Sequence, residues 1–270
     1  MKFKRPRIRP LDWSDDSALV ALNHVKIAMN KTGRLPEGTD FYEDKKTDTQ
    51  FFLFHSERFV TCTFRATESS KWRDIKRDLK FWKVKASEQS WRFGKVHRGF
   101  KGGVSSVWPG YILDKINIAL DEGREVRIHG HSLGAGEGAY LAWDLVHTNG
   151  IRPSEVYLFG SPRLGNKRFA DAYNALLYNV TFNVWNYRDP VPTIPFAHWN
   201  FRHFGRIVYY DNLGNRHVNP KRSFVFKNRI FGSLKKSCFK KKNTEMGRYH
   251  GAKIYEETII ASSEETRGCA

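Results

Sequence analysis

Apolar residues recur at helical spacing near the start of the chain. On one face of a helix expected from about residue 15 to 30 lie Leu19, Leu22, Val25 and Met29. Asp15 or Asp16 is placed to cap the start of this helix, where backbone N–H groups need an acceptor. Two runs rich in β-branched and aromatic residues follow, and they predict strands at 51–55 and 59–65.

Strand-like and helix-like segments then alternate. A strand is expected at 91–97, ended by Gly99, Gly102 and Gly103, and a helix is expected at 111–120. We expect further strands at 125–129, 155–159, 180–187 and 206–210, and further helices at 133–147, 167–177 and 252–261. This alternation predicts an α/β protein with a mostly parallel central sheet flanked by helices.

Composition indicates a globular protein with a strong positive charge. A chain of 270 residues can bury a sizeable core, and we divide it into a basic N-terminal arm at 1–14 and a single domain at 15–270. Its 46 Lys and Arg against 28 Asp and Glu leave a net charge of +18. Such a field attracts anionic partners, namely lipid headgroups, nucleic acid or acidic surfaces.

Cysteine spacing and hydropathy bear on the compartment. The three cysteines form neither a metal-binding spacing nor a disulfide framework, which favours a reducing environment. No apolar stretch follows the basic N-terminus, and no run approaches the length of a membrane span. We therefore expect no signal peptide, no transmembrane segment, and a cytoplasmic or peripheral membrane location.

The candidate nucleophile is Ser132. Residues 130–134 read Gly-His-Ser-Leu-Gly, a pattern that places a serine on a sharp turn between a strand and a helix. Val126 and Ile128 supply the strand, and a run of small residues after Gly134 supplies a helix able to pack closely on a sheet. The alternative is an ordinary glycine-rich turn with a solvated serine.

A catalytic serine needs a histidine as base and a carboxylate to hold that histidine, in the chain order Ser, acid, His. Asp144 and Asp171 fall on expected helices, whereas Asp189 and Asp211 each follow an expected strand. We favour Asp189 because it opens a rigid Asp-Pro-Val-Pro turn. Asp211 opens a sequence typical of a hairpin turn.

The base is harder to choose. Four histidines follow Asp189: His198, His203, His217 and His250. His250 precedes the last expected helix, on a loop that can reach over the edge of the sheet. A solvated loop histidine is the alternative there.

Six short motifs occur in order along the chain. They are TFRAT at 63–67, VHRGF at 96–100, GHSLG at 130–134, FGSPRLGN at 159–166, DPVPTIP at 189–195 and HFG at 203–205. Together they resemble the class 3 lipases, the fungal-type triacylglycerol lipase family within the α/β-hydrolases. Ala66 departs from the glycine that is usual in this family, and the basic stretch before His250 is unusually long.

The resemblance implies an α/β-hydrolase fold and a serine ester hydrolase that acts on acyl glycerides or phospholipids without a cofactor or metal. Ser132, Asp189 and His250 match the catalytic residues, while His203 matches a structural position. The backbone N–H groups of Thr67 and Leu133 match the oxyanion hole. The alternatives are an esterase for a small soluble ester and a catalytically weak relative that binds anionic lipid.

The resemblance also implies a mobile lid at about 68–85. One face of a helix there carries Trp72, Ile75, Leu79 and Trp82, surrounded by Lys and Arg. Such a basic amphipathic helix is typical of contact with an anionic membrane, and the alternative is an apolar stripe that covers the core.

A basic insertion at about 221–243 has nine Lys and Arg and no Asp or Glu. It is compatible with a solvated loop, a headgroup-binding patch or a nucleic-acid contact. Nucleic acid is the least favoured partner because the chain carries no recognised motif for it.

Overall fold

The computed structural model is built around one mixed sheet. It describes residues 10–30, 34–65, 82–88, 90–108, 110–232 and 249–268. For residues 265–268 it describes the backbone alone. Thr67, the lid positions Trp72, Ile75 and Leu79, and residues 233–243 of the basic insertion lie outside these ranges.

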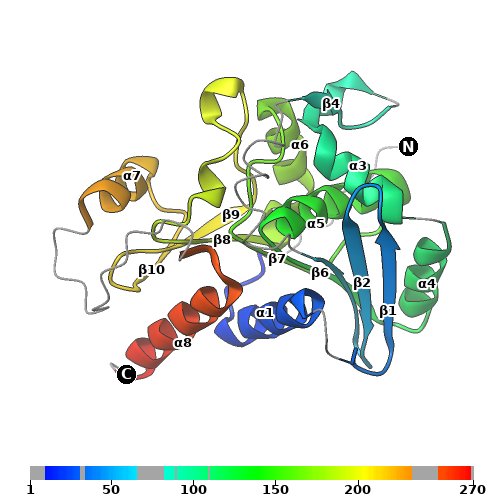
Figure 1. Cartoon of the computed structure of the whole chain (residues 1–270), viewed down its shortest axis with the longest axis horizontal. Coiled ribbons are helices and arrows are strands. Elements are labelled where there is room, and N and C mark those ends of the chain that lie inside the picture. Colours follow the sequence, from blue (N-terminus) through cyan, green and yellow to red (C-terminus); the bar gives the residue numbers. More distant parts are fainter. Residues whose placement is uncertain are drawn as a thin grey trace.

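Eight strands form the sheet in the order β1-β2-β3-β6-β7-β8-β9-β10 (Figure 1). They are β1 (Thr39–Asp44), β2 (Thr49–His55), β3 (Phe59–Phe64), β6 (Glu125–His131), β7 (Glu155–Phe159), β8 (Thr181–Asn186), β9 (Arg206–Tyr210) and β10 (Arg216–Val218). Every pairing from β3 to β9 is parallel, and the pairings at the two edges are antiparallel. The mostly parallel sheet is confirmed.

Helices cover both faces of the sheet (Figure 1). One face carries α1 (Asp15–Met29) and α8 (Ala252–Gly268), and the other carries α3 (Arg98–Val107), α5 (Leu133–Asp144) and α6 (Lys167–Leu177). The remaining described helices are α4 (Gly110–Asp121) and α7 (Arg222–Phe231), and a two-stranded sheet joins β4 (Lys83–Lys85) to β5 (Lys95–His97). None of the described helices is long and apolar enough to span a bilayer.

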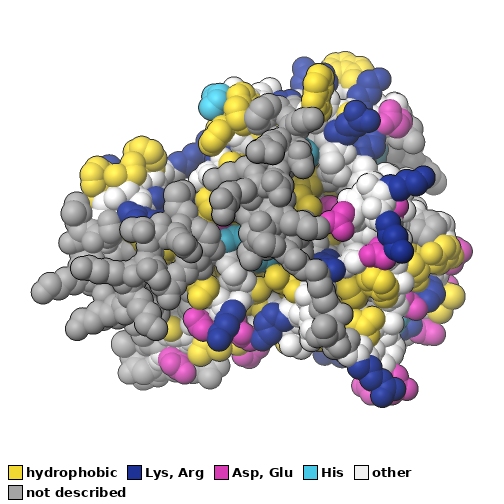
Figure 2. All heavy atoms as spheres, in the orientation of Figure 1, with side chains coloured by type: hydrophobic (Ala, Val, Ile, Leu, Met, Phe, Trp, Pro, Cys, Tyr) yellow, Lys and Arg dark blue, Asp and Glu magenta, His cyan; other side chains and the backbone are white. Residues whose placement is uncertain are grey.

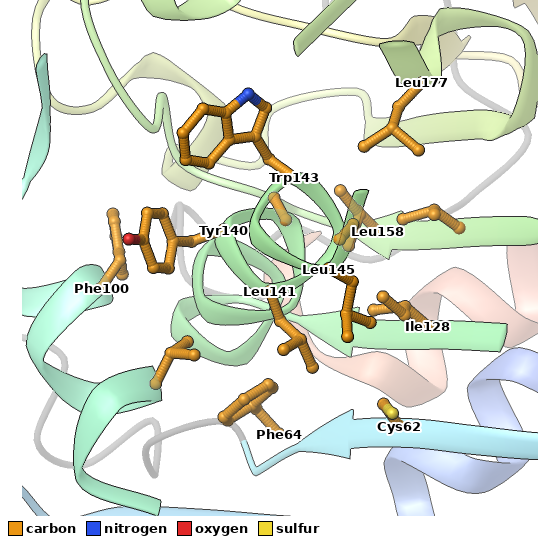
Figure 3. Close-up of a cluster of buried hydrophobic side chains, with 14 of the residues drawn as sticks. Cys62, Phe64, Phe100, Ile128, Tyr140, Leu141, Trp143, Leu145, Leu158 and Leu177 are labelled. Atoms are coloured by element: carbon orange, nitrogen blue, oxygen red, sulfur yellow. The ribbon is translucent and has the colours of Figure 1, made fainter. Parts of the chain in front are cut away.

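The larger core cluster surrounds α5. Figure 3 shows Leu141 and Leu145 directed toward the strands, close to Ile128, while Tyr140 lies against Phe100 of α3. All five side chains are at most 4% exposed. This packing holds the start of α5, and with it Ser132, firmly at the carboxyl edge of the sheet.

Two predictions near the N-terminus are corrected. Ser14, not Asp15 or Asp16, caps α1, because its side chain accepts a hydrogen bond from Ser17 N at 3.1 Å. Residues 11–14 also belong to the packed domain rather than to an arm: the Trp13 ring meets Phe182 edge-on at 5.2 Å.

Further segments also differ from prediction. Gly99, Gly102 and Gly103 lie inside α3, since Phe100, Val104 and Val107 bury one face of that helix. Other elements were also not predicted: the strands β1, β4 and β10, and α7 within the basic insertion. The expected strand at 91–97 is a 3₁₀ turn followed by the short β5.

Candidate active site

Ser132 occupies a strained turn between β6 and α5. Its φ of +58° and ψ of −126° lie in a sparsely populated region, at a cost of about 1–3 kcal/mol. Its N–H donates to Phe159 O of β7 at 2.9 Å. A Cβ on Gly134 would lie 2.4 Å from Phe64 O, so the backbone approach requires glycine there. Among the described residues, the buried Ser132 Oγ has no hydrogen-bond partner.

Asp189 and His250 are in direct contact. His250 Nδ1 lies 2.9 Å from Oδ2 and 3.0 Å from Oδ1 of Asp189, whose side chain is fully buried. Because Nδ1 faces a carboxylate, it carries the ring proton, and Nε2 is left with a lone pair. Val191 N donates to Asp189 Oδ1 at 2.8 Å and fixes the carboxylate from the turn predicted to hold it.

His131 brings this pair to the Ser132 turn. Its ring stacks on the His250 ring with centroids 4.5 Å apart, and its Nε2 lies 2.5 Å from His250 O. Burial and the neighbouring His250 lower the pKa of His131 to about 3, so it is neutral and donates from Nε2 to that carbonyl. His131 immediately precedes Ser132, and therefore one rigid contact joins the nucleophile's turn to the base.

Two groups beyond the predicted set support Asp189. Tyr255 Oη of α8 donates to Asp189 Oδ2 at 2.5 Å, and burial with the nearby carboxylate raises the pKa of Tyr255 well above its usual value. From α7, Arg229 Nη2 donates to Asp189 O at 2.5 Å. Neither residue belongs to a local motif that would have identified it.

Gly160 fits against the Asp189–His250 pair. A Cβ there would lie 2.6 Å from Asp189 Oδ2 and 2.9 Å from His250 Nδ1, and its φ is +57°. The glycine lies in the predicted FGSPRLGN motif, and its absent side chain leaves the space that the carboxylate and imidazole occupy.

The rival acid and bases have other partners. The Asp211 carboxylate accepts from Leu213 N, Asn215 N and His217, so it organises the hairpin between β9 and β10. The His203 ring packs on Trp185 at 4.2 Å between centroids. The exposed His198 stacks on Phe196.

The proposed oxyanion donors are only partly described. Leu133 is the first residue of α5, where N–H groups have no partner within the helix and the helix dipole favours negative charge. Thr67 lies outside the described residues, so its position stays a prediction. Within the described ranges, no group of three or more His, Cys, Asp or Glu side chains is arranged to hold a metal ion.

Comparison with known proteins bears on this geometry. The family model named Lipase (class 3) matches residues 61–199, just over half of the chain. The chain belongs to the class 3 lipase family. The match includes Ser132, Leu133 and Asp189 and ends before His250, so the contact between His250 and Asp189 is an observation independent of it.

Curated relatives of this class 3 lipase-family chain are named as lipases. It is 33% identical over 140 residues to Lipase ZK262.3 of Caenorhabditis elegans, covering 50% of this chain and 38% of the relative. It is 29% identical over 136 residues to the secreted mono- and diacylglycerol lipase LIP1 of Malassezia globosa, covering 47% and 43%. The chain thus spans about two fifths of the length of these relatives.

Solved structures show the same α/β-hydrolase fold. The triacylglyceride lipase of Rhizomucor miehei superposes with a TM-score of 0.62 at 22% identity, over 75% of this chain and 82% of that one. A member of a family of fungal lipases superposes with a TM-score of 0.64 at 20% identity, over 76% and 85%. At this level of identity the likeness concerns the fold.

Proposed function

We propose that this protein is a serine carboxylic-ester hydrolase that acts on acyl glycerides or phospholipids. The observation that carries the proposal is the buried contact between Asp189 and His250, joined through His131 to the strained turn of Ser132. Membership of the class 3 lipase family supports the same chemistry.

In this mechanism Ser132 Oγ attacks the ester carbonyl while His250 Nε2 takes its proton. The Asp189 carboxylate stabilises the imidazolium that forms. The N–H groups of Leu133 and Thr67 stabilise the oxyanion of the tetrahedral intermediate, where losing one donor costs about 10²–10³ in rate. His250 then protonates the departing alcohol, and water, deprotonated by His250, hydrolyses the acyl-serine to the free acid.

Glycerides are the first substrate class to test, because relatives of this chain are described as mono- and diacylglycerol lipases. A small soluble ester is the second candidate. A catalytically weak lipid-binding relative is disfavoured by the intact Asp189–His250 contact. For the whole protein we propose a cytoplasmic or peripheral membrane location, with contact to anionic lipid through the lid segment and the basic insertion.

A hydrolysis panel tests this proposal. The substrates are p-nitrophenyl butyrate, a diacylglycerol emulsion, a triacylglycerol emulsion and anionic phospholipid vesicles. Ser132→Ala should lower every rate by about 10⁴-fold or more, because the residual rate comes from binding and oxyanion stabilisation alone. Asp211→Asn is the control that tests the choice of Asp189 as the catalytic acid. Because Asp211 holds a hairpin and not His250, this variant should retain activity. A wild-type rate no higher than that of Ser132→Ala on all four substrates would refute the proposal.

A further inference from the structure

Besides Phe224, which packs on His217, helix α7 exposes three large apolar side chains. Phe226, Ile230 and Phe231 are 64%, 47% and 57% exposed. The helix already has a buried face, because Val225 packs with Trp185 and Tyr209 in a core cluster. The three exposed side chains are therefore not part of the core that holds α7 to the sheet, and they form an outward apolar face.

Cations lie beside this face. Lys221, Arg222 and Lys227 are exposed on α7 and at its N-cap, and residues 221–232 contain no Asp or Glu. Figure 2 shows hydrophobic side chains gathered over α7 with Lys or Arg next to them. This combination fits the boundary of an anionic bilayer, where apolar rings enter below the headgroups and cations meet lipid phosphates.

Hydrogen bonds tie α7 to the catalytic acid. Arg229 donates from its guanidinium to Asp189 O, and Arg188 Nε donates back to Arg229 O at 3.1 Å. Asn212 Nδ2 donates to Gly232 O at 2.9 Å and holds the end of the helix. A surface bound to α7 is thereby held in a set position relative to Asp189.

We propose that α7 is a docking helix for an anionic lipid surface. Phe226, Ile230 and Phe231 insert at the headgroup boundary, and Arg222 and Lys227 pair with the phosphates. The choice of lipid as partner rests on the proposed ester hydrolase function, while the docking step itself requires no catalysis. The apolar face of α7 is separate from the lid. Its contribution to lipid binding is separate from that of the positive charge of the whole basic insertion.

Vesicle sedimentation tests the proposal in a Ser132→Ala background, so that no lipid is consumed and a failure of the hydrolase assignment cannot mimic a failure of docking. The probes are vesicles of phosphatidylcholine alone and of phosphatidylcholine with 30 mol% phosphatidylglycerol. Phe226→Ser and Phe231→Ser should each weaken binding to the anionic vesicles about tenfold, since each ring loses part of a burial free energy of about 25 cal/mol per Å². The control is Ile118→Ser on α4, because Ile118 is similarly exposed at 56% and α4 lies near the other end of the sheet (Figure 1). The affinity of this variant for the anionic vesicles should stay within twofold of that of the parent.

The charge contribution is tested separately. Arg222→Gln with Lys227→Gln should weaken binding to anionic vesicles and leave binding to neutral vesicles within twofold, whereas the exposed Lys253→Gln on α8 should change neither. Thermal unfolding of each variant, with a midpoint within a few degrees of the parent, shows that the fold is kept. Three results would overturn the proposal: equal affinity of the parent and both Phe variants, an equal loss in Ile118→Ser, or tighter binding to a DNA duplex than to vesicles that is lost in the Phe variants.

Discussion

Replacing Glu137 by Gln should stabilise the protein at neutral pH. Glu137 lies on α5 and is 4% exposed, with Thr49 Oγ1 as a hydrogen-bond donor at 3.4 Å. A Cβ on the neighbouring Gly103 would lie 2.3 Å from Glu137 Oε1, so the carboxyl group fills a tight space against α3. Burial raises the pKa of Glu137 to about 8, from 4.5 for the free side chain.

The sign and size of the effect follow from these two values. Below pH 4.5 the carboxyl group is protonated in both the folded and the unfolded protein, and it costs nothing. As the pH rises from 4.5 to 8, the unfolded chain releases the proton while the folded protein keeps it, so the free energy of unfolding falls by about 1.4 kcal/mol per pH unit. At pH 7 this penalty is about 3 kcal/mol, and Gln, which does not titrate, avoids it.

Urea unfolding at pH 5, 6, 7 and 8 measures this penalty. The difference in the free energy of unfolding between Glu137→Gln and wild type should grow steadily over this range. Glu57→Gln, at an exposed position, is the control and should show a constant difference near zero. A difference for Glu137→Gln that is the same at every pH would show that the carboxyl group is already ionised in the folded protein, against the reasoning from burial.

Two predictions concern the catalytic site. Gly160→Ala should lower kcat/KM by about 10²-fold or more with little loss of secondary structure, because the new Cβ displaces Asp189 or His250. Ester turnover measures kcat/KM and circular dichroism measures the secondary structure. Near-normal turnover would contradict this reasoning. Tyr255→Phe should lower the free energy of unfolding by about 1.5–3 kcal/mol, because the buried Asp189 carboxylate loses a hydrogen bond. It should also move the acid limb of the pH–rate profile to higher pH, since a carboxylate with fewer donors holds the imidazolium more strongly. An unshifted profile would indicate a purely structural Tyr255.

Local sequence rules were sufficient for the middle of the chain. The strands expected at 155–159 and 206–210 and the helix at 167–177 coincide with β7, β9 and α6. Both strands are almost entirely buried, so a short run of aliphatic and aromatic residues was sufficient to predict them. Helix α6 has one buried face, and the side chain of Asn166 caps its start. The choice of Asp189 over Asp211 also followed from local chemistry, because each turn sequence predicted what its aspartate does.

Tertiary contacts decided the remainder. Three glycines predict a break at the start of α3, yet burial of Phe100 against α5 outweighs a helical cost of about 1 kcal/mol per glycine. Nothing in the neighbourhood of Tyr255 along the sequence indicates that its hydroxyl meets a carboxylate 66 residues away. Periodicity and turn chemistry report on neighbours within a few residues, so they located the nucleophile and the acid. The residues that hold Asp189 and His250 in place are Arg229 of α7, Tyr255 of α8 and His131 at the end of β6. Only folding brings those elements together.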